Sequence, residues 1–168
     1  YPTQPVVAAT FNTELAEELG KCMSEDMLAS EVTGIFAPGL NVHRTAYGGT
    51  NFENYSEDSL LCGKTGAALV RGIRNKMGYA IGKNLGLQAQ ETNKWGASLF
   101  TDEQTIRQLY LEPFRIAVEE GEMTAVMTSP ARVGTVWAGA HKGLLTDVLR
   151  GEWGFRGTVM TDQAMFGG

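Results

Sequence analysis

The chain has 168 residues, of which 43% are apolar and 20% charged, and its formal net charge is −5. At roughly 150 residues per domain this length predicts one domain, and the composition excludes a disordered tail or a fibre. An acidic chain lacks the positive surface that neutralises phosphates, so we expect no nucleic-acid partner. The apolar runs, such as Ala67-Ala68-Leu69-Val70, are far shorter than the ~20 residues of a membrane helix, so we expect no membrane partner.

The first part of the chain predicts two strands, one helix and a long loop. Residues 6–11 form a short β-branched run that is typical of a buried strand. Asn12 or Thr13 can cap the helix that follows, in which apolar residues recur at helical spacing up to Met27. Residues 32–40 predict a second strand, and residues 41–58 form a loop longer than the usual connection, as functional loops often are.

Helices and strands alternate along the rest of the chain. They are predicted at residues 59–77 (helix), 79–81 (strand), 102–118 (helix), 123–129 (strand), 142–153 (helix) and 158–161 (strand). Asp58 or Ser59 can cap the first of these helices, and Thr101-Asp102-Glu103-Gln104 has the form of a capping box for the second. Pro113 should kink or split that second helix because it cannot donate a backbone hydrogen bond.

This order of elements predicts an α/β fold. The strands are rich in Val and Ala and show no polar alternation, which is typical of a parallel sheet covered on both faces. The 21 glycines cluster where strands meet loops. Periodicity alone does not distinguish an open sheet from a closed barrel.

For two sequence features, a structural role in the fold is a better explanation than a ligand-binding site. Cys62-Gly63-Lys64-Thr65 looks like the end of a phosphate-binding loop, but Asp58 stands where that loop needs its first glycine. We therefore exclude a nucleotide site and predict that Lys64 is an exposed helix residue. Cys22 and Cys62 are too few for a disulfide framework or a zinc site, so we predict small buried side chains.

No metal or cofactor is expected from the residue pattern. His43 and His141 lie far apart in the sequence, and neither belongs to a ligand spacing that supports a metal ion. A lone histidine is more often a hydrogen-bonded structural residue than a ligand.

Charged residues follow three of the predicted strands. Asp162 directly follows residues 158–161, Lys83 follows residues 79–81, and Arg44 lies beyond residues 32–40. In α/β barrels and open sheets, ligands bind at the carboxyl ends of the strands. A carboxylate at that edge can act as a nucleophile, a base or an acceptor for a sugar hydroxyl, and the alternative is a simple solvated charge.

Several motifs, in the same order, resemble those of the N-terminal barrel domain of family 3 glycoside hydrolases, the β-glucosidase group. They are Ala9-Thr10-Phe11-Asn12, Ala37-Pro38-Gly39-Leu40-Asn41-Val42-His43-Arg44, Asn51-Phe52-Glu53-Asn54-Tyr55-Ser56-Glu57-Asp58, Gln90-Glu91-Thr92-Asn93, and Leu144-Leu145-Thr146-Asp147-Val148-Leu149-Arg150-Gly151-Glu152-Trp153-Gly154-Phe155 with Asp162 after it.

The resemblance implies retaining hydrolysis of terminal β-linked glucosyl or related residues, with a carbohydrate as the partner. Asp162 stands in the position of the family's nucleophile, whereas the family's acid/base normally comes from a following domain. The resemblance also implies that residues 1–168 form one segment of a TIM-type (β/α) barrel, with about five strands and four helices and without the second domain. A partial barrel has open sheet edges, through which it could self-associate or bind a complementary chain.

The chain departs from the family at several sugar-contacting positions. The family's Lys-His pair is Lys83-Asn84 here, and an arginine after Gln-Glu-Thr-Asn is Lys94. The resemblance implies that these three residues and Arg44 bind substrate. Thr50 stands in place of another arginine, Pro130 lies where the family has tyrosine, and Gln163 lies where it often has tryptophan. A catalytically decayed chain that binds sugar or serves assembly is therefore the alternative reading, and we expect residues 1–168 alone to be inactive.

Overall fold

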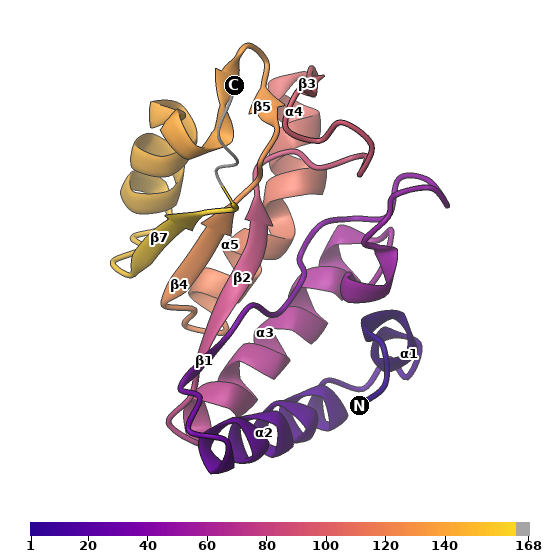
Figure 1. The fold of residues 1–168 in the computed structure, drawn as a ribbon, viewed down its shortest axis with the longest axis vertical. Helices are drawn as coiled ribbons and strands as arrows, with labels where there is room; N and C mark the ends of the chain where they lie inside the picture. The colour runs from indigo at the N-terminus through magenta and orange to yellow at the C-terminus, as the bar shows by residue number, and fades with distance from the viewer. Residues whose placement is uncertain (164–168) are drawn as a thin grey trace.

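The structure is a computed structural model and describes residues 1–163 (Figure 1). Within this range the main sheet has four parallel strands in the order β1-β2-β4-β7. Their bounds are Gly34–Ile35 (β1), Tyr79–Leu85 (β2), Ala125–Thr128 (β4) and Thr158–Thr161 (β7). Each strand pairs with the next one along the chain, and the order never reverses as it does in a doubly wound sheet. The prediction of an α/β fold with parallel repeats of a partial TIM-type barrel is confirmed.

Two helices precede the first strand, and the others lie between successive strands of the main sheet. The α-helices are α1 (Gln4–Ala8), α2 (Thr13–Ala29), α3 (Ser59–Asn75), α4 (Glu103–Thr105) and α5 (Glu112–Glu119). Two segments are π-helical, η2 (Ile106–Leu111) and η4 (Gly143–Glu152), and two are single 3₁₀ turns, η1 (Asn51–Glu53) and η3 (Ala138–Ala140). A second, smaller sheet joins β3 (Ser98–Leu99), β5 (Arg132–Val133) and β6 (Val136–Trp137). Among residues 1–163 no helix is long and apolar enough to cross a bilayer.

The main sheet separates two apolar clusters of very different size. Helices α3 and α5 both pack against β2, with α3 drawn to the right of this strand in Figure 1, and this side contains the larger core, in which Leu69, Val126 and Phe114 are completely buried. The opposite, inner face carries a small cluster of Ile81, Ala125 and Met127, with Met160 packed against it. Neighbouring residues of one strand, such as Ala125 and Val126, face opposite sides of the sheet.

Glycines allow α2 and α3 to approach closely. A Cβ atom on Gly72 would lie 2.0 Å from the carbonyl oxygen of Glu17, and one on Gly20 would lie 2.4 Å from that of Leu69. Real Cβ atoms do not come this close to backbone oxygens, so the two helices pack backbone against backbone at this crossing.

Two predictions for the first part of the chain need correction. Residues 6–11 do not form a strand, because α1 covers Gln4–Ala8 and Pro5 lies in its first turn, where the missing N–H costs nothing. The strand predicted at residues 32–40 is regular only over Gly34–Ile35. Pro38 cannot donate a ladder hydrogen bond, and beyond it only Gly39 forms isolated bridges.

Helix capping is partly as predicted. The side chains of Asn12 and Asp58 accept hydrogen bonds from Leu15 N–H (3.0 Å) and Leu61 N–H (2.6 Å), which confirms both caps. The predicted capping box is wrong by one residue, because Asp102, and not Thr101, caps α4. Its carboxylate accepts from the N–H and the hydroxyl of Thr105, both at 2.8 Å, and these bonds lower the pKa of Asp102.

The helix predicted at residues 102–118 is not split at Pro113 but forms an unbroken helical run over residues 103–119, in which the hydrogen-bond pattern changes from α to π and back to α. The π-helical η2 ends at Leu111, and Pro113 lies in the first turn of α5. A proline is tolerated in a first turn because the N–H it lacks would have no partner inside the helix.

Strand β2 contains one irregularity that decides where its polar side chains point. Gly82 pairs with Val126, but Leu85 pairs with Thr128, so the register shifts between them. Ala80 and Leu85 both belong to the helix-side core although they are an odd number of residues apart. A β-bulge has this effect, because one extra residue in the strand makes every following side chain point to the opposite face of the sheet. The peptide bond between Lys83 and Asn84 is cis.

Candidate functional site

Asp162 lies at the carboxyl end of β7, one residue beyond the last strand residue. Its N–H donates to the carbonyl oxygen of Thr128 (3.4 Å), which continues the β4–β7 ladder by one step. The half-buried side chain accepts two hydrogen bonds: Oδ1 accepts from Gln163 N–H at 2.7 Å, and Oδ2 accepts from Asn84 Nδ2 at 3.1 Å. Both carboxylate oxygens therefore have a defined orientation.

Asn84 reaches Asp162 across the inner face of the sheet. It lies on β2, two strands away from β7, and its Nδ2 is also 3.5 Å from the Sδ of Met127 on the intervening strand. Only 8% of Asn84 is exposed. The register shift in β2 turns this side chain towards the carboxylate, so the structure brings together two of the predicted site residues, Asp162 and Asn84.

The backbone of Asn84 is held by the side chain of Asn41. Asn84 N–H donates to Asn41 Oδ1 (2.9 Å), and Asn41 Nδ2 donates to the carbonyl oxygen of Asn84 (3.0 Å). The backbone N–H of Asn41 donates in turn to Asn54 Oδ1 (3.1 Å). Both Asn41 and Asn54 are 5% exposed. Three buried amide side chains thus connect the loop after β1 to the carboxylate at the end of β7.

Sequence analysis did not single out Asn41 or Asn54. Asn41 directly follows residues 32–40, so the rule that selected Arg44 at the end of that segment also covers Asn41. A criterion that selects charged residues at strand ends does not select an amide side chain.

His43 belongs to the structure of the same loop. Its Nε2 lies 2.9 Å from the carbonyl oxygens of both Asn51 and Asn54, so it can donate to them only when Nε2 carries the proton. Asn54 Nδ2 also donates to the carbonyl oxygen of Thr50 (2.9 Å). These bonds tie the loop together around η1.

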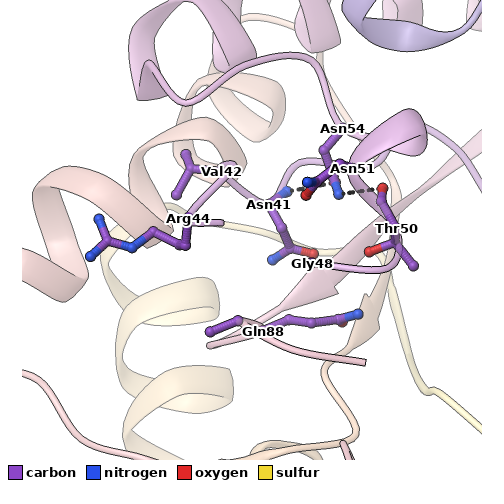
Figure 2. A pocket seen from close by; sticks show the side chains of 9 residues that line it. Asn41, Val42, Arg44, Gly48, Thr50, Asn51, Asn54 and Gln88 are labelled. Atoms are coloured by element: carbon purple, nitrogen blue, oxygen red, sulfur yellow. Dashed lines mark hydrogen bonds between the residues drawn. The ribbon is translucent and has the colours of Figure 1, made fainter. Parts of the chain in front are cut away.

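A small polar cavity lies beside this loop (Figure 2). Asn41, Thr50 and Asn54 line one side of it and Gln88 lies opposite them. Its volume of about 10 Å³ is close to the minimum that holds one water molecule. Gln88 Oε1 is buried and has no hydrogen-bond partner among the described residues, which makes a polar occupant favourable.

The three cationic residues predicted at the site each have another partner. In Figure 2 the guanidinium of Arg44 points away from Asn41 and Gln88, and it lies 5.7 Å from the centre of the Tyr110 ring. Lys83 forms an ion pair with Glu53. Lys94 Nζ is 2.5 Å from Glu91 Oε1 and 4.9 Å from the centre of the Trp95 ring.

Lys83 nevertheless lies beside a hollow, and Lys94 lies in a segment that contacts the end of β7. Lys83 and Glu53 line a hollow of about 350 Å³ together with Gln4, Phe36 and Phe52. Next to Lys94, the indole N–H of Trp95 donates to the carbonyl oxygen of Gln163 (3.0 Å), the residue that follows Asp162. The segment that carries Lys94 is therefore attached to the end of β7.

The structure shows where the residues for which we predict a structural role lie, and the prediction of a buried side chain is right for Cys62 but wrong for Cys22. Lys64 is partly exposed on α3 and pairs with Glu120 at 2.7 Å. Cys62 is completely buried, and burial raises its pKa to about 12, whereas Cys22 is only half-buried. Within residues 1–163, no three His, Cys, Asp or Glu side chains are grouped as metal ligands.

Comparisons with known proteins agree with the fold and with the motif order. The sequence matches the family described as "Glycosyl hydrolase family 3 N terminal domain" over residues 1–168. It is 35% identical over 162 residues to beta-glucosidase B of Emericella nidulans and 36% identical over 161 residues to a beta-glucosidase of Ruminococcus albus. Both alignments cover 96% of this chain, but only 19% and 17% of the two relatives.

Solved structures give the same result. Beta-glucosidase 3B from Thermotoga neapolitana in complex with glucose is similar with a TM-score of 0.94 and 36% identity, over 96% of this chain and 23% of that one. The beta-glucosidase from Kluyveromyces marxianus in complex with glucose gives a TM-score of 0.95 at 32% identity, over 96% of this chain and 20% of that one. The chain thus spans about a fifth of its relatives, and it belongs to glycosyl hydrolase family 3, within the N-terminal domain of that family.

Proposed function

We propose that this chain provides the nucleophile of a retaining glycosidase that hydrolyses terminal β-linked glucosyl residues, and that Asp162 is this nucleophile. The observation that carries the proposal is the half-buried carboxylate at the carboxyl end of β7, oriented by Gln163 N–H and Asn84 Nδ2. This edge of a parallel sheet is where barrel enzymes place their chemistry. The relatives named as beta-glucosidases support the substrate class.

In the proposed reaction an oxygen of Asp162 attacks the anomeric carbon, and the bond from that carbon to the leaving oxygen breaks. A second carboxylic acid gives its proton to the leaving oxygen, and then takes one from the water that hydrolyses the glycosyl ester. In a retaining pair the two carboxyl groups lie about 5 Å apart. Because Lys83 and Lys94 engage Glu53 and Glu91, we propose that the second acid comes from outside this segment.

Without that acid, residues 1–168 alone should hydrolyse little or nothing. Loss of general acid–base assistance costs about 10²–10⁴-fold in rate. Measurable turnover by the isolated segment would contradict this part of the proposal.

A labelling experiment tests the nucleophile. A 2-deoxy-2-fluoro-β-glucoside with a good leaving group should trap a glycosyl ester, and peptide mass spectrometry should locate it on Asp162. The protein as its gene encodes it should be used. Asp162→Asn should abolish labelling and turnover, whereas Asp147→Asn, which changes an exposed carboxylate paired with Lys142, should leave both unchanged. A label on a different carboxylate would refute the assignment.

A second candidate function is a chain that binds sugar without hydrolysing it. The observation that favours it is that Asp162 is retained while Thr50, Asn84 and Pro130 stand where the family has other residues at sugar-contacting positions. Calorimetry with glucose distinguishes the two functions, because binding with neither label nor turnover supports this candidate. Absence of binding as well leaves only a structural role.

A further inference from the structure

We propose that Asn41 is a positioning residue for Asp162, and that it acts through the backbone of Asn84. This inference rests on the proposed function, because it concerns how the nucleophile is held. Asn41 makes no hydrogen bond to Asp162 itself, so its effect must pass through another residue.

Strand β2 is irregular in the segment that contains Asn84. Between Gly82 and Leu85 the register with β4 shifts, and the regular ladder is interrupted. At this point the Asn41 side chain supplies both an acceptor for Asn84 N–H and a donor for the Asn84 carbonyl oxygen, at 2.9 and 3.0 Å. It therefore bonds to the backbone of residue 84 as a neighbouring strand would. Without it, two buried backbone groups would lose these partners, which is unfavourable.

The position of the Asn84 backbone determines the contact with Asp162. Asn84 has only two side-chain torsions, and its Nδ2 is placed by them and by the Cα position. That nitrogen is 3.1 Å from Asp162 Oδ2, close to the upper end of the usual range for such a bond. A small displacement of the Asn84 backbone would therefore weaken the bond and release one carboxylate oxygen.

Asn41 is itself fixed in place. It is 5% exposed, and its N–H is bonded to Asn54 Oδ1 at 3.1 Å. The loop after β1 thus fixes Asn41, and the orientation of the Asp162 carboxylate depends on Asn41 through Asn84. The hydrogen bonds from Asn41 therefore control the distance between the nucleophile and the anomeric carbon. A displacement of about 1 Å can cost on the order of 10²-fold in rate.

The test measures labelling by the 2-deoxy-2-fluoro-β-glucoside in the protein as its gene encodes it. For each variant, the rate constant is expressed per site that finally becomes labelled, so that misfolded molecules do not count. We expect Asn41→Ala and Asn84→Ala each to lower this rate constant about tenfold, with little change in the apparent dissociation constant of the reagent. The double variant should be no slower than Asn84→Ala alone, because Asn41 acts through Asn84.

Asn12→Ala is the matched control. It removes the cap of α2, makes no contact with the site, and should lower stability without changing the rate constant per labelled site. If Asn41→Ala does not fold, Asn41→Ser, which removes fewer atoms but cannot reach both backbone groups, should show a smaller decrease in the same direction.

Three results would overturn the inference. The first is an unchanged rate constant per site in the Asn41 variant that folds. The second is a double variant slowed by the product of the two single effects, because Asn41 would then act independently of Asn84. The third is a wild-type protein that is not labelled at Asp162, which removes the proposed function at the same time and is thereby distinguished from the first two.

Discussion

The helix-covered face of the main sheet and its inner face differ in how much apolar side chain each buries. The helix side contains a continuous core built by α2, α3, α5 and the strands, with Leu69, Phe114 and Val126 completely buried. The inner face has only Ile81, Ala125 and Met127, with Met160 beside them. The amide side chains that lead to Asp162 lie at the carboxyl end of this thinner face. The difference indicates that stability is concentrated on one side of the sheet and polar positioning on the other.

The largest expected effect comes from truncating the two cores. Phe114→Ala should lower the free energy of unfolding by about 3–5 kcal/mol, because it opens a cavity in the dense helix-side core. Met127→Ala, on the inner face, should cost only about 2 kcal/mol, because few apolar neighbours surround it. Urea denaturation measures both. Equal losses would show that the two faces contribute alike to stability.

A smaller effect is expected where α2 crosses α3. Gly72→Ala places a Cβ atom against the carbonyl oxygen of Glu17, so the helices must separate, at a cost of about 1–3 kcal/mol. Gly151→Ala is the control, because its nearest atom, the carbonyl oxygen of Thr146, lies at an ordinary 3.4 Å. That variant should be neutral or more stable by less than about 1 kcal/mol. A harmless Gly72→Ala would contradict the close backbone contact.

The smallest expected effect is a difference in reactivity between the two cysteines of the helix layer, and measuring it requires no mutation. Burial raises the pKa of Cys62 to about 12, so at pH 8 it is a buried thiol and not the reactive thiolate. Cys22 is half-buried and should react first with a thiol reagent such as Ellman's, whereas Cys62 should react only after urea is added. Rapid reaction of both cysteines in the native protein would mean that the helix layer opens readily.

The sequence predicted most of the regular elements because their signals are local. The caps at Asn12 and Asp58 and the period of the apolar residues were sufficient for α2 and α3, and apolar runs were sufficient for β4 and β7. The strand predicted at residues 79–81 is too short, because β2 extends to Leu85 and Lys83 lies within it, not beyond its end. The strand predicted at residues 6–11 is wrong, because β-branched residues also occur in helices and Pro5 fits the first turn of α1. Short apolar runs fit a strand and a buried helix equally well.

The site was predictable only in part, for a different physical reason. Asp162 follows from the rule that strand ends meet at one edge of a parallel sheet. The contact between Asn84 and Asp162 depends on the register shift in β2, which arises from pairing with a strand about forty residues away and leaves no mark on the local pattern. The two hydrogen bonds between Asn41 and the Asn84 backbone depend on the same shift. Neither contact could therefore be predicted from the spacing of these residues in the sequence.

The strand order described above also determines where another strand can join. Among residues 1–163, β1 and β7 are the outermost strands of the main sheet. A strand added beside β1 would pair with only two strand residues. Pro38 follows them closely, so this edge has few backbone N–H donors. Beside β7, the four residues Thr158–Thr161 present a regular and longer template. The edge at β7 is therefore the longer of the two, and a further strand there would lie directly next to Asp162.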